Sequence, residues 1–441
     1  MFDPKTLNAL AVKLHGRQIG VINRLGGDRH LFSFEQGYID DPDRPVLSLS
    51  YKGQSGGLGH LRDYLAARAG VKPQREFFLL AVLGADLPGA LVVEPMEGNA
   101  AAHEGEDQHE EQRAGETALR FSLAGVQLKF SAVMEASGGL TIPAGGMGGS
   151  WIVKLPSARF PSVPENEYAM LALARAVGIE VPANRLIDVG SISGLPQDAG
   201  AMKGQALAVQ RFDRRPGGES VHMEDFAQVF GLFPDDKYRE RSYANIAAVL
   251  WAETGEAGTY DFLRRLVFSV LIGNADMHLK NWSLLYPDRR TPVLSPAYDF
   301  VATLPYIPND TLALSFGGSR SLTEITRDQV RRFADTARLP VSPLWPMVTE
   351  MTDRTVAAWE TLDEKNLMPD DMRKAIGEQI MTVATVRLSL NSYNRDAGHR
   401  LGAEWACFFL TLKSFPLGMG AIRCARYLTV PDVILRNTRL R

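Results

Sequence analysis

The stretch Gly273–Tyr286, GNADMHLKNWSLLY, carries the pattern that decides the fold of this 441-residue chain. The apolar run LVFSVLIG before it predicts a buried helix that delivers Asp276 at its end. Asn281 follows five positions later, SLLY predicts a short strand, and Asp299 lies in the motif SPAYDF, 23 positions after Asp276. Two carboxylates and an amide are thus expected to meet beyond the end of one helix.

This set of side chains is what phosphoryl transfer requires. One carboxylate orients the attacking hydroxyl, while an amide and a second carboxylate hold magnesium against the phosphates. The Asp-x-x-x-x-Asn spacing is that of a protein-kinase catalytic loop, and Asp-Phe resembles the start of the metal-binding motif of kinases. We therefore expect Asp276 to act on the acceptor, and Asn281 and Asp299 to bind Mg²⁺, which prefers oxygen ligands.

Further upstream, the chain offers groups that could hold the nucleotide. The segment WIVKLP places Lys154 on a predicted strand between apolar neighbours, where a charge needs a partner, and the next helix offers Glu167 or Glu165. Residues 122–129, SLAGVQLK, predict a turn of small residues whose N–H groups could face phosphate, although the P-loop pattern is absent. The segment GQALAVQRFDR ends the strands where an adenine-binding hinge would fall.

The order of predicted elements indicates an α+β fold with two lobes, a β-rich N-lobe and a helical C-lobe, preceded by a small mixed N-terminal subdomain. Three short strands are predicted within residues 7–36, and from His222 onward, beginning with HMEDFAQVFG, the chain is predicted to be helical. The expected parts are an N-terminal subdomain (1–97), an acidic linker (98–117), the N-lobe (118–212), the C-lobe (213–401) and a C-terminal tail (402–441).

Composition excludes several classes of protein. A net charge of −3 argues against a chain that mainly coats nucleic acid, and two cysteines, Cys407 and Cys424, exclude a disulfide scaffold and a cysteine-built zinc site. No signal peptide is visible at the start of the chain. The most apolar stretch, 405–422, is interrupted by Lys413 and Pro416. We expect a cytoplasmic protein that makes no contact with a membrane.

Seven motifs in this order resemble the HipA family, the serine/threonine kinase toxins of bacterial HipBA toxin–antitoxin modules. They are SLAGVQLKFSA, WIVKLP, ENEYAMLALARAVGIEVP, VQRFDR, HMEDFAQVFG, LIGNADMHLKNWSLLY and SPAYDF, and they span residues 122–303. Residues 7–95 resemble the small N-terminal subdomain of the family. The resemblance implies a two-lobed protein-kinase-like fold, ATP and Mg²⁺ as cofactors, and self-inactivation by autophosphorylation.

Carried over position by position, the resemblance implies a role for each matching residue. Asp276 would be the catalytic aspartate, Asn281 and Asp299 would hold magnesium, and Ser122 would be the autophosphorylated serine. In the family this modification expels the phosphate-covering loop. The residues that would bind the nucleotide are Ala124, Gly125, Val126, Gln127, Leu128, Lys129, Lys154, Gln210, Arg211, Phe212, His278, Lys280, Asn281, Tyr298 and Asp299.

Partners also follow from the resemblance. The implied substrate is a protein, glutamyl-tRNA synthetase in the family, and the implied partner is a HipB-like helix-turn-helix antitoxin that holds the toxin on operator DNA. Two positions depart from the family pattern: Gln210 stands where glutamate is frequent, and Leu128 removes a charge beside the phosphates. Residues 423–441, with five Arg against one Asp, could contact DNA or the antitoxin, or form a solvated tail.

Two other classes of function stay open at this point. The same fold and metal-binding residues could serve a small-molecule phosphotransferase, because they do not name the acceptor. A catalytically weak co-repressor, retained only as a partner of the antitoxin, is the third hypothesis. The presence of Lys154, Asp276, Asn281 and Asp299 argues against the co-repressor, and Ser122 favours the protein kinase over the small-molecule enzyme.

Overall fold

The computed structural model describes most of the chain, and its described residues up to Leu390 belong to one compact unit. The described residues are 7–25, 29–51, 77, 80–81, 84–96, 128–135, 138–143, 148–157, 159–195, 202–232, 238 and 241–393. Several predictions lie outside them, namely those for the linker (98–117), the segment from Ser122 to Gln127 and the tail (402–441). The division into these five parts stays a prediction.

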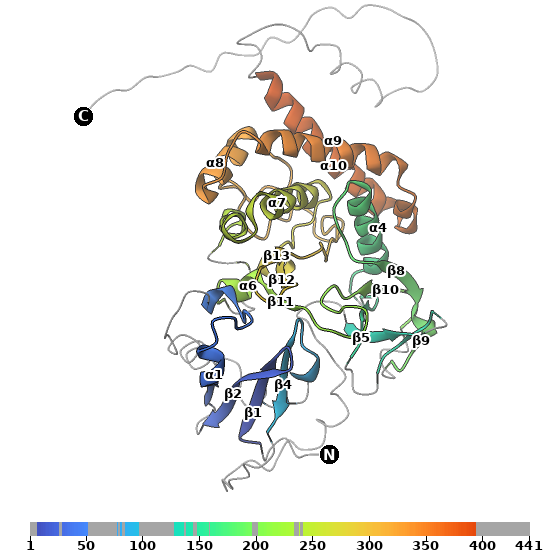
Figure 1. Ribbon diagram of the computed structural model, residues 1–441. Helices are drawn as coiled ribbons and strands as arrows, with labels where there is room; N and C mark the ends of the chain where they lie inside the picture. The colour runs from blue at the N-terminus through green and yellow to red at the C-terminus, as the bar shows by residue number, and fades with distance from the viewer. Residues whose placement is uncertain are drawn as a thin grey trace, which may run out of the picture. The chain divides into compact units, whose positions relative to one another are not determined.

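The N-terminal part forms an antiparallel sheet in the order β3-β2-β1-β4 (Figure 1). Alternating apolar residues such as Leu10, Val12 and Leu14 face a small core of their own. The three strands predicted within residues 7–36 are confirmed. The elements are β1 Ala9–Leu14, β2 Arg17–Leu25, β3 Arg29–Phe34, α1 Gln36–Ile39, η2 Leu49–Tyr51, η3 Gly84–Asp86 and β4 Leu91–Pro95.

A second sheet, in the order β8-β10-β7-β5-β6-β9, forms the strand-rich lobe (Figure 1). Helix α4 packs beside β8 and β10 with nine of its 14 residues buried, and Gly178, whose φ of 90° favours glycine, follows its end. The elements are β5 Lys129–Met134, β6 Leu140–Thr141, β7 Trp151–Lys154, α4 Val163–Ala176, β8 Asn184–Asp188, η4 Val189–Ser191, β9 Ile192–Ser193 and β10 Gln205–Gln210.

The helical lobe surrounds α7, whose buried face holds Phe262 and Phe268 (Figure 1). The helical geometry of α7 is interrupted by a kink at Gly255, where φ is 66°. The elements are α6 Phe226–Val229, α7 Tyr243–Leu271, η6 Leu279–Asn281, α8 Arg327–Ala337, α9 Leu344–Thr361, η7 Glu364–Leu367, α10 Asp370–Tyr393, and a sheet of β11 His222–Asp225, β12 Ser283–Tyr286 and β13 Val293–Leu294.

The helical prediction for HMEDFAQVFG was wrong at its first half. Residues His222–Asp225 form β11, which pairs antiparallel with β12, and their side chains alternate between buried and half-buried. Asp225 then caps the one-turn helix α6, since its carboxylate accepts from the Gln228 N–H at 2.9 Å and the Gln228 side chain bonds back. The apolar residues of this segment fit both the period of a helix and that of a strand. Antiparallel pairing with the SLLY segment of β12 selects the strand.

The N-terminal part is joined to the lobes through a buried ionic cluster, which we call the junction cluster and which consists of Asp86, Arg211, Asp213 and Arg214. Asp86 Oδ1 accepts from Arg211 and Arg214 at 2.9 Å each, and both arginines also bond Asp213. A second contact between the N-terminal part and the lobes centres on Glu224.

Among the helices that the structure describes, none is long and apolar enough to cross a lipid bilayer.

Glu224 on β11 is 1% exposed, and its carboxylate accepts three hydrogen bonds. Ser48 Oγ donates at 2.6 Å, the Leu49 N–H donates at 2.9 Å, and the Tyr286 hydroxyl donates to the same oxygen as Leu49. Burial raises the pKa of Glu224 above its ordinary value, and the three donors only partly offset this effect. The folded protein therefore binds a proton at this site more readily than the unfolded chain does.

This raised pKa sets a pH dependence. The stability that the protein gains from protonated Glu224 is complete below the ordinary pKa of 4.5. It is lost as the pH rises through the pKa of Glu224 in the folded protein. In Glu224→Gln the amide oxygen can accept from Leu49 and Tyr286 while its NH₂ group donates to Ser48. We expect the free energy of unfolding, measured with urea between pH 4.5 and 8, to favour Glu224→Gln increasingly over the wild type as the pH rises. If the difference in free energy between the two proteins did not change with pH, this expectation would be contradicted.

Candidate active site

Lys154, at the end of β7, lies at the centre of a buried group of charges. Its side chain is 7% exposed, and its ammonium contacts both Glu167 Oε1 on α4 and Asp299 Oδ1. The predicted partner is confirmed: of the two candidates Glu167 pairs with the lysine, whereas Glu165 lies half-buried in the first turn of α4. The antiparallel pairing of β7 with β5 and the approach of α4 fix these positions.

Lys129 joins the same group from the neighbouring strand. It is the direct partner of Lys154 in the register of β5 and β7, and its Nζ lies 3.6 Å from Asp299 Oδ2. Two like charges opposite each other on a sheet repel unless a counter-charge lies between them. Asp299 supplies that counter-charge. The sequence predicted Lys129 only as a member of the phosphate loop, and its contact with Asp299 was missed.

Lys154 and Asp299 hold each other in their ionised forms, whereas burial outweighs the Lys154 ammonium at Glu167 and raises the pKa of that carboxyl. Burial alone would lower the pKa of Lys154, but Asp299 and Glu167 outweigh burial and raise it above its usual range. For Asp299, burial opposes ionisation, and the ammonium groups of Lys129 and Lys154 hold the pKa of the carboxyl well below its usual range. Asp299 is therefore a carboxylate at neutral pH.

The loop that follows α7 is held by its own side chains. Gly273, at φ 69°, turns the chain after the helix, and a Cβ there would meet Leu304 Cβ at 2.9 Å. Asn274 then accepts from the Asp276 N–H at 3.0 Å and donates to the Asp299 carbonyl at 3.3 Å. Asn274 thus connects the two acidic segments. This role of Asn274 was not predicted, although the motif GNAD places an amide two positions before the predicted catalytic aspartate.

Asp276 presents its carboxylate at the surface of this loop, with the side chain 53% exposed. Its Oδ1 accepts from the Tyr238 hydroxyl at 2.6 Å and lies 4.0 Å from His278 Nε2. Asn281 donates from Nδ2 to the Asp276 carbonyl at 2.8 Å. The structure therefore brings Asp276, His278 and Asn281 together, and it adds Tyr238, which the sequence analysis did not identify.

The residues predicted to hold magnesium fit that ion chemically. The described part of the chain contains no group of three or more His, Cys, Asp or Glu side chains that could hold a metal. Magnesium does not need one, because it is commonly held by one or two carboxylates, substrate phosphates and water. Asp299 offers a charged carboxylate, and the bond from Asn281 Nδ2 leaves the amide oxygen at the other end of that group.

The predicted hinge begins at Gln210, the last residue of β10, and its residues face different surroundings. Gln210 is exposed, whereas Arg211 is buried and extends to Asp86 and Asp213 of the junction cluster. The Arg211 guanidinium therefore belongs to the contact with the N-terminal part. Nucleotide binding by Arg211 stays a prediction. Its backbone N–H donates to the Ser150 carbonyl at 2.8 Å.

Phe212 lies against Tyr298, with the ring centroids 5.5 Å apart. The Tyr298 hydroxyl forms a 2.6 Å hydrogen bond with Ser283 Oγ and donates to the Lys280 carbonyl at 2.9 Å. These contacts join the end of β10 to the segment that carries Asp299. They bring Phe212, Tyr298 and the Lys280 backbone together, and nucleotide binding by these residues stays a prediction.

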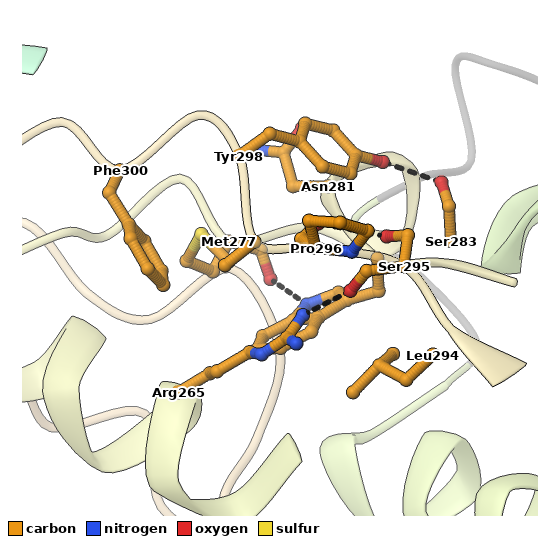
Figure 2. Close-up of a pocket in the computed structure, with 11 residues that line it drawn as sticks. Arg265, Met277, Asn281, Ser283, Leu294, Ser295, Pro296, Tyr298 and Phe300 are labelled. Atoms are coloured by element: carbon orange, nitrogen blue, oxygen red, sulfur yellow. Dashed lines mark hydrogen bonds between the residues drawn. The ribbon is translucent and has the colours of Figure 1, made fainter. Parts of the chain in front are cut away.

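A small pocket lies behind this segment, and Figure 2 shows Arg265 of α7 extending beneath Pro296. The guanidinium donates to the Ser295 carbonyl at 2.6 Å and pairs with Asp261. Lys154 and Asp299 are not among its lining residues. Its lining includes Asn281 and Tyr298, and the bond from Arg265 to the Ser295 carbonyl supports the loop before Tyr298.

Comparison with known proteins supports this assignment of the fold. The family model of the HipA-like C-terminal domain matches residues 121–359. A protein of Sinorhizobium fredii named "Putative kinase Y4dM" is 50% identical over 385 residues, which are 82% of this chain and 93% of that protein. The serine/threonine-protein kinase toxin HipA of Shewanella oneidensis is 26% identical over 328 residues, 66% of this chain and 72% of that protein.

A solved structure shows the same fold. It is the complex of HipA, HipB and operator DNA from Shewanella oneidensis, which this chain matches with a TM-score of 0.62 at 21% identity, covering 88% of this chain and all of that one. The two-lobed kinase-like fold expected from the sequence is thereby confirmed. The family model spans more than half of the chain, and the sequence identity to Y4dM extends over most of its length. The chain belongs to the HipA family.

Proposed function

We propose that this protein is an ATP- and magnesium-dependent serine/threonine protein kinase that acts as the toxin of a toxin–antitoxin module. The observation that carries the proposal is the arrangement of Lys154, which contacts both Glu167 and Asp299 beside the Asp276–Asn281 loop. A lysine paired with a helix glutamate and a metal-binding aspartate is the arrangement that protein kinases need for catalysis.

The proposed reaction is in-line transfer of the ATP γ-phosphoryl group to a protein hydroxyl. Asp276 would orient this hydroxyl and take up its proton, and Lys154 would bind the α- and β-phosphates. Asn281 and Asp299 would hold Mg²⁺, which when bound neutralises charge on the phosphates. Phe212 and Tyr298 would contact the adenine side of the nucleotide.

The partners we propose follow the relatives. The Shewanella structure contains HipB and operator DNA, which supports a helix-turn-helix antitoxin and a DNA-bound complex for this chain as well. Glutamyl-tRNA synthetase is the proposed substrate, Ser122 the proposed autophosphorylation site and the cytoplasm the proposed location. The substrate and the autophosphorylation site rest on the resemblance to the family, and the location rests on the sequence features described above.

Labelled ATP tests the activity directly. Purified protein incubated with [γ-³²P]ATP and Mg²⁺ should label itself on Ser122, and Asp276→Asn should slow labelling at least a hundredfold, because general-base catalysis is typically worth about that much. The exposed control Asp335→Asn on α8 should keep the wild-type rate. Ser122→Ala should lose the label while still phosphorylating glutamyl-tRNA synthetase.

Other outcomes would redirect the proposal. Asp276→Asn at the wild-type rate would refute the assignment of the catalytic loop. Label on other residues in Ser122→Ala would move the modified site. A preparation free of phosphate that binds ATP but labels no protein would favour a small-molecule acceptor.

A further inference from the structure

The contact between Tyr238 and Asp276 is not explained by the functions assigned above. The phenol donates to Asp276 Oδ1 at 2.6 Å, a length typical of a hydrogen bond from O–H to a charged carboxylate. Tyr238 lies between α6 and α7 in the sequence, far from Asp276 along the chain but directly on its side chain. Such a contact fixes one oxygen of the group that is to act on the acceptor.

The ring of Tyr238 is itself held in place by the C-lobe. It meets the ring of His278 edge-to-face, with centroids 5.2 Å apart, and Arg320 donates to the Tyr238 carbonyl at 3.3 Å. Since His278 belongs to the catalytic loop, Tyr238 is anchored on the same loop that it contacts. Burial, followed by the bond to Asp276, raises the pKa of Tyr238, so that the phenol remains a donor at neutral pH.

The contact leaves room for an acceptor. A carboxylate has about four sites for hydrogen bonds on its two oxygens, and Tyr238 occupies one of them. The side chain of Asp276 is still 53% exposed with Tyr238 in place. The backbone of Asp276 is meanwhile fixed on both sides, by Asn274 at its N–H and by Asn281 at its carbonyl.

We infer that Tyr238 is a positioning residue, whose hydroxyl orients the Asp276 carboxylate so that its second oxygen, Oδ2, faces the acceptor hydroxyl. This inference rests on the proposed kinase function. The fixed backbone leaves rotation of the side chain as the main freedom of Asp276, and a bond to Oδ1 removes that freedom. Misplacement of a catalytic group by about 1 Å can cost as much as a hundredfold in rate.

The variant Tyr238→Phe tests the inference, because it removes the hydroxyl and keeps the ring against His278. The rate of self-labelling with [γ-³²P]ATP and Mg²⁺ is measured as a function of ATP concentration. We expect the maximal rate to fall at least about tenfold, as loss of one hydrogen bond to a charged group predicts. The half-saturating ATP concentration and the midpoint of thermal unfolding should not change. Tyr260→Phe, the same change on α7 beside Trp251, should behave as the wild type.

Each other outcome has a defined meaning. A Tyr238→Phe enzyme at the wild-type rate, with Asp276→Asn inactive, would overturn the positioning role and leave the kinase function standing. A faster Tyr238→Phe enzyme would show that the phenol blocks the acceptor position, and phosphate found on Tyr238 would make it an acceptor. Both results would overturn the inference. An active Asp276→Asn enzyme would instead refute the underlying function.

Discussion

Replacing Lys154 by methionine should lower the free energy of unfolding by about 3–5 kcal/mol, the cost of removing one partner from a buried ion pair. Glu167 is 1% exposed, and without the lysine its carboxylate would remain buried with no cation in contact. Methionine fills a similar volume, so the loss would report charge rather than a cavity. Urea unfolding followed by circular dichroism measures the change, and phosphoryl transfer should be lost in the same variant.

A double variant separates the two effects of this change. In Lys154→Met with Glu167→Gln the buried negative charge is gone, and we expect part of the lost stability to return. Activity should not return, because the phosphates would still lack the lysine. If Lys154→Met were as stable as the wild type, the buried ion pair would not contribute to stability.

Asp299→Asn should reduce phosphoryl transfer at least about a thousandfold, since stabilisation of charge by a bound metal ion is worth several kcal/mol. The change removes the carboxylate proposed to hold magnesium and the counter-charge shared by Lys129 and Lys154. Rate measurements over a range of Mg²⁺ concentrations would show whether the loss is one of metal binding. Activity close to that of the wild type would exclude Asp299 as a metal ligand.

The backbone at Asp299 provides a matched control. Its φ of 55° lies in the left-handed region, which Asp and Asn enter more easily than other residues with a Cβ. Asp299→Asn should therefore keep the local conformation. Asp299→Ala loses the same charge but should be less stable than Asp299→Asn by about 1 kcal/mol, the penalty for an ordinary residue in this region.

The sequence predicted the structure correctly where apolar periodicity, or the need to neutralise a buried charge, identifies an element or a contact. Strands β1, β2 and β7 and helix α4 follow from their apolar periodicity, and the pairing of Lys154 with Glu167 follows from the need to neutralise a buried charge. In each case the nearest neighbours along the chain carry the information. The family motifs added the order of these elements.

Contacts between distant segments could not be predicted in this way. The register of β5 against β7 places Lys129 opposite Lys154, and register depends on pairing rather than on composition. The bond from Tyr238 to Asp276 joins segments 38 residues apart. Strand β11 was assigned as helix because its partner, β12, lies 58 to 64 residues further along the chain.

The junction cluster bears on how the chain could be divided for expression. The family model begins at residue 121, so a fragment cut to its limits would keep Arg211 and Arg214 but lose Asp86. It would also lose Ser48, which donates a hydrogen bond to buried Glu224. At its other end it would lose the Gln379 amide, which donates to the Val270 carbonyl of α7 at 3.0 Å. Such a fragment would leave Arg211 and Arg214 to share Asp213 alone and would expose the surfaces that the lost segments cover, so we expect it to aggregate. The matched segment defines the family, whereas the folding unit extends beyond it in both directions.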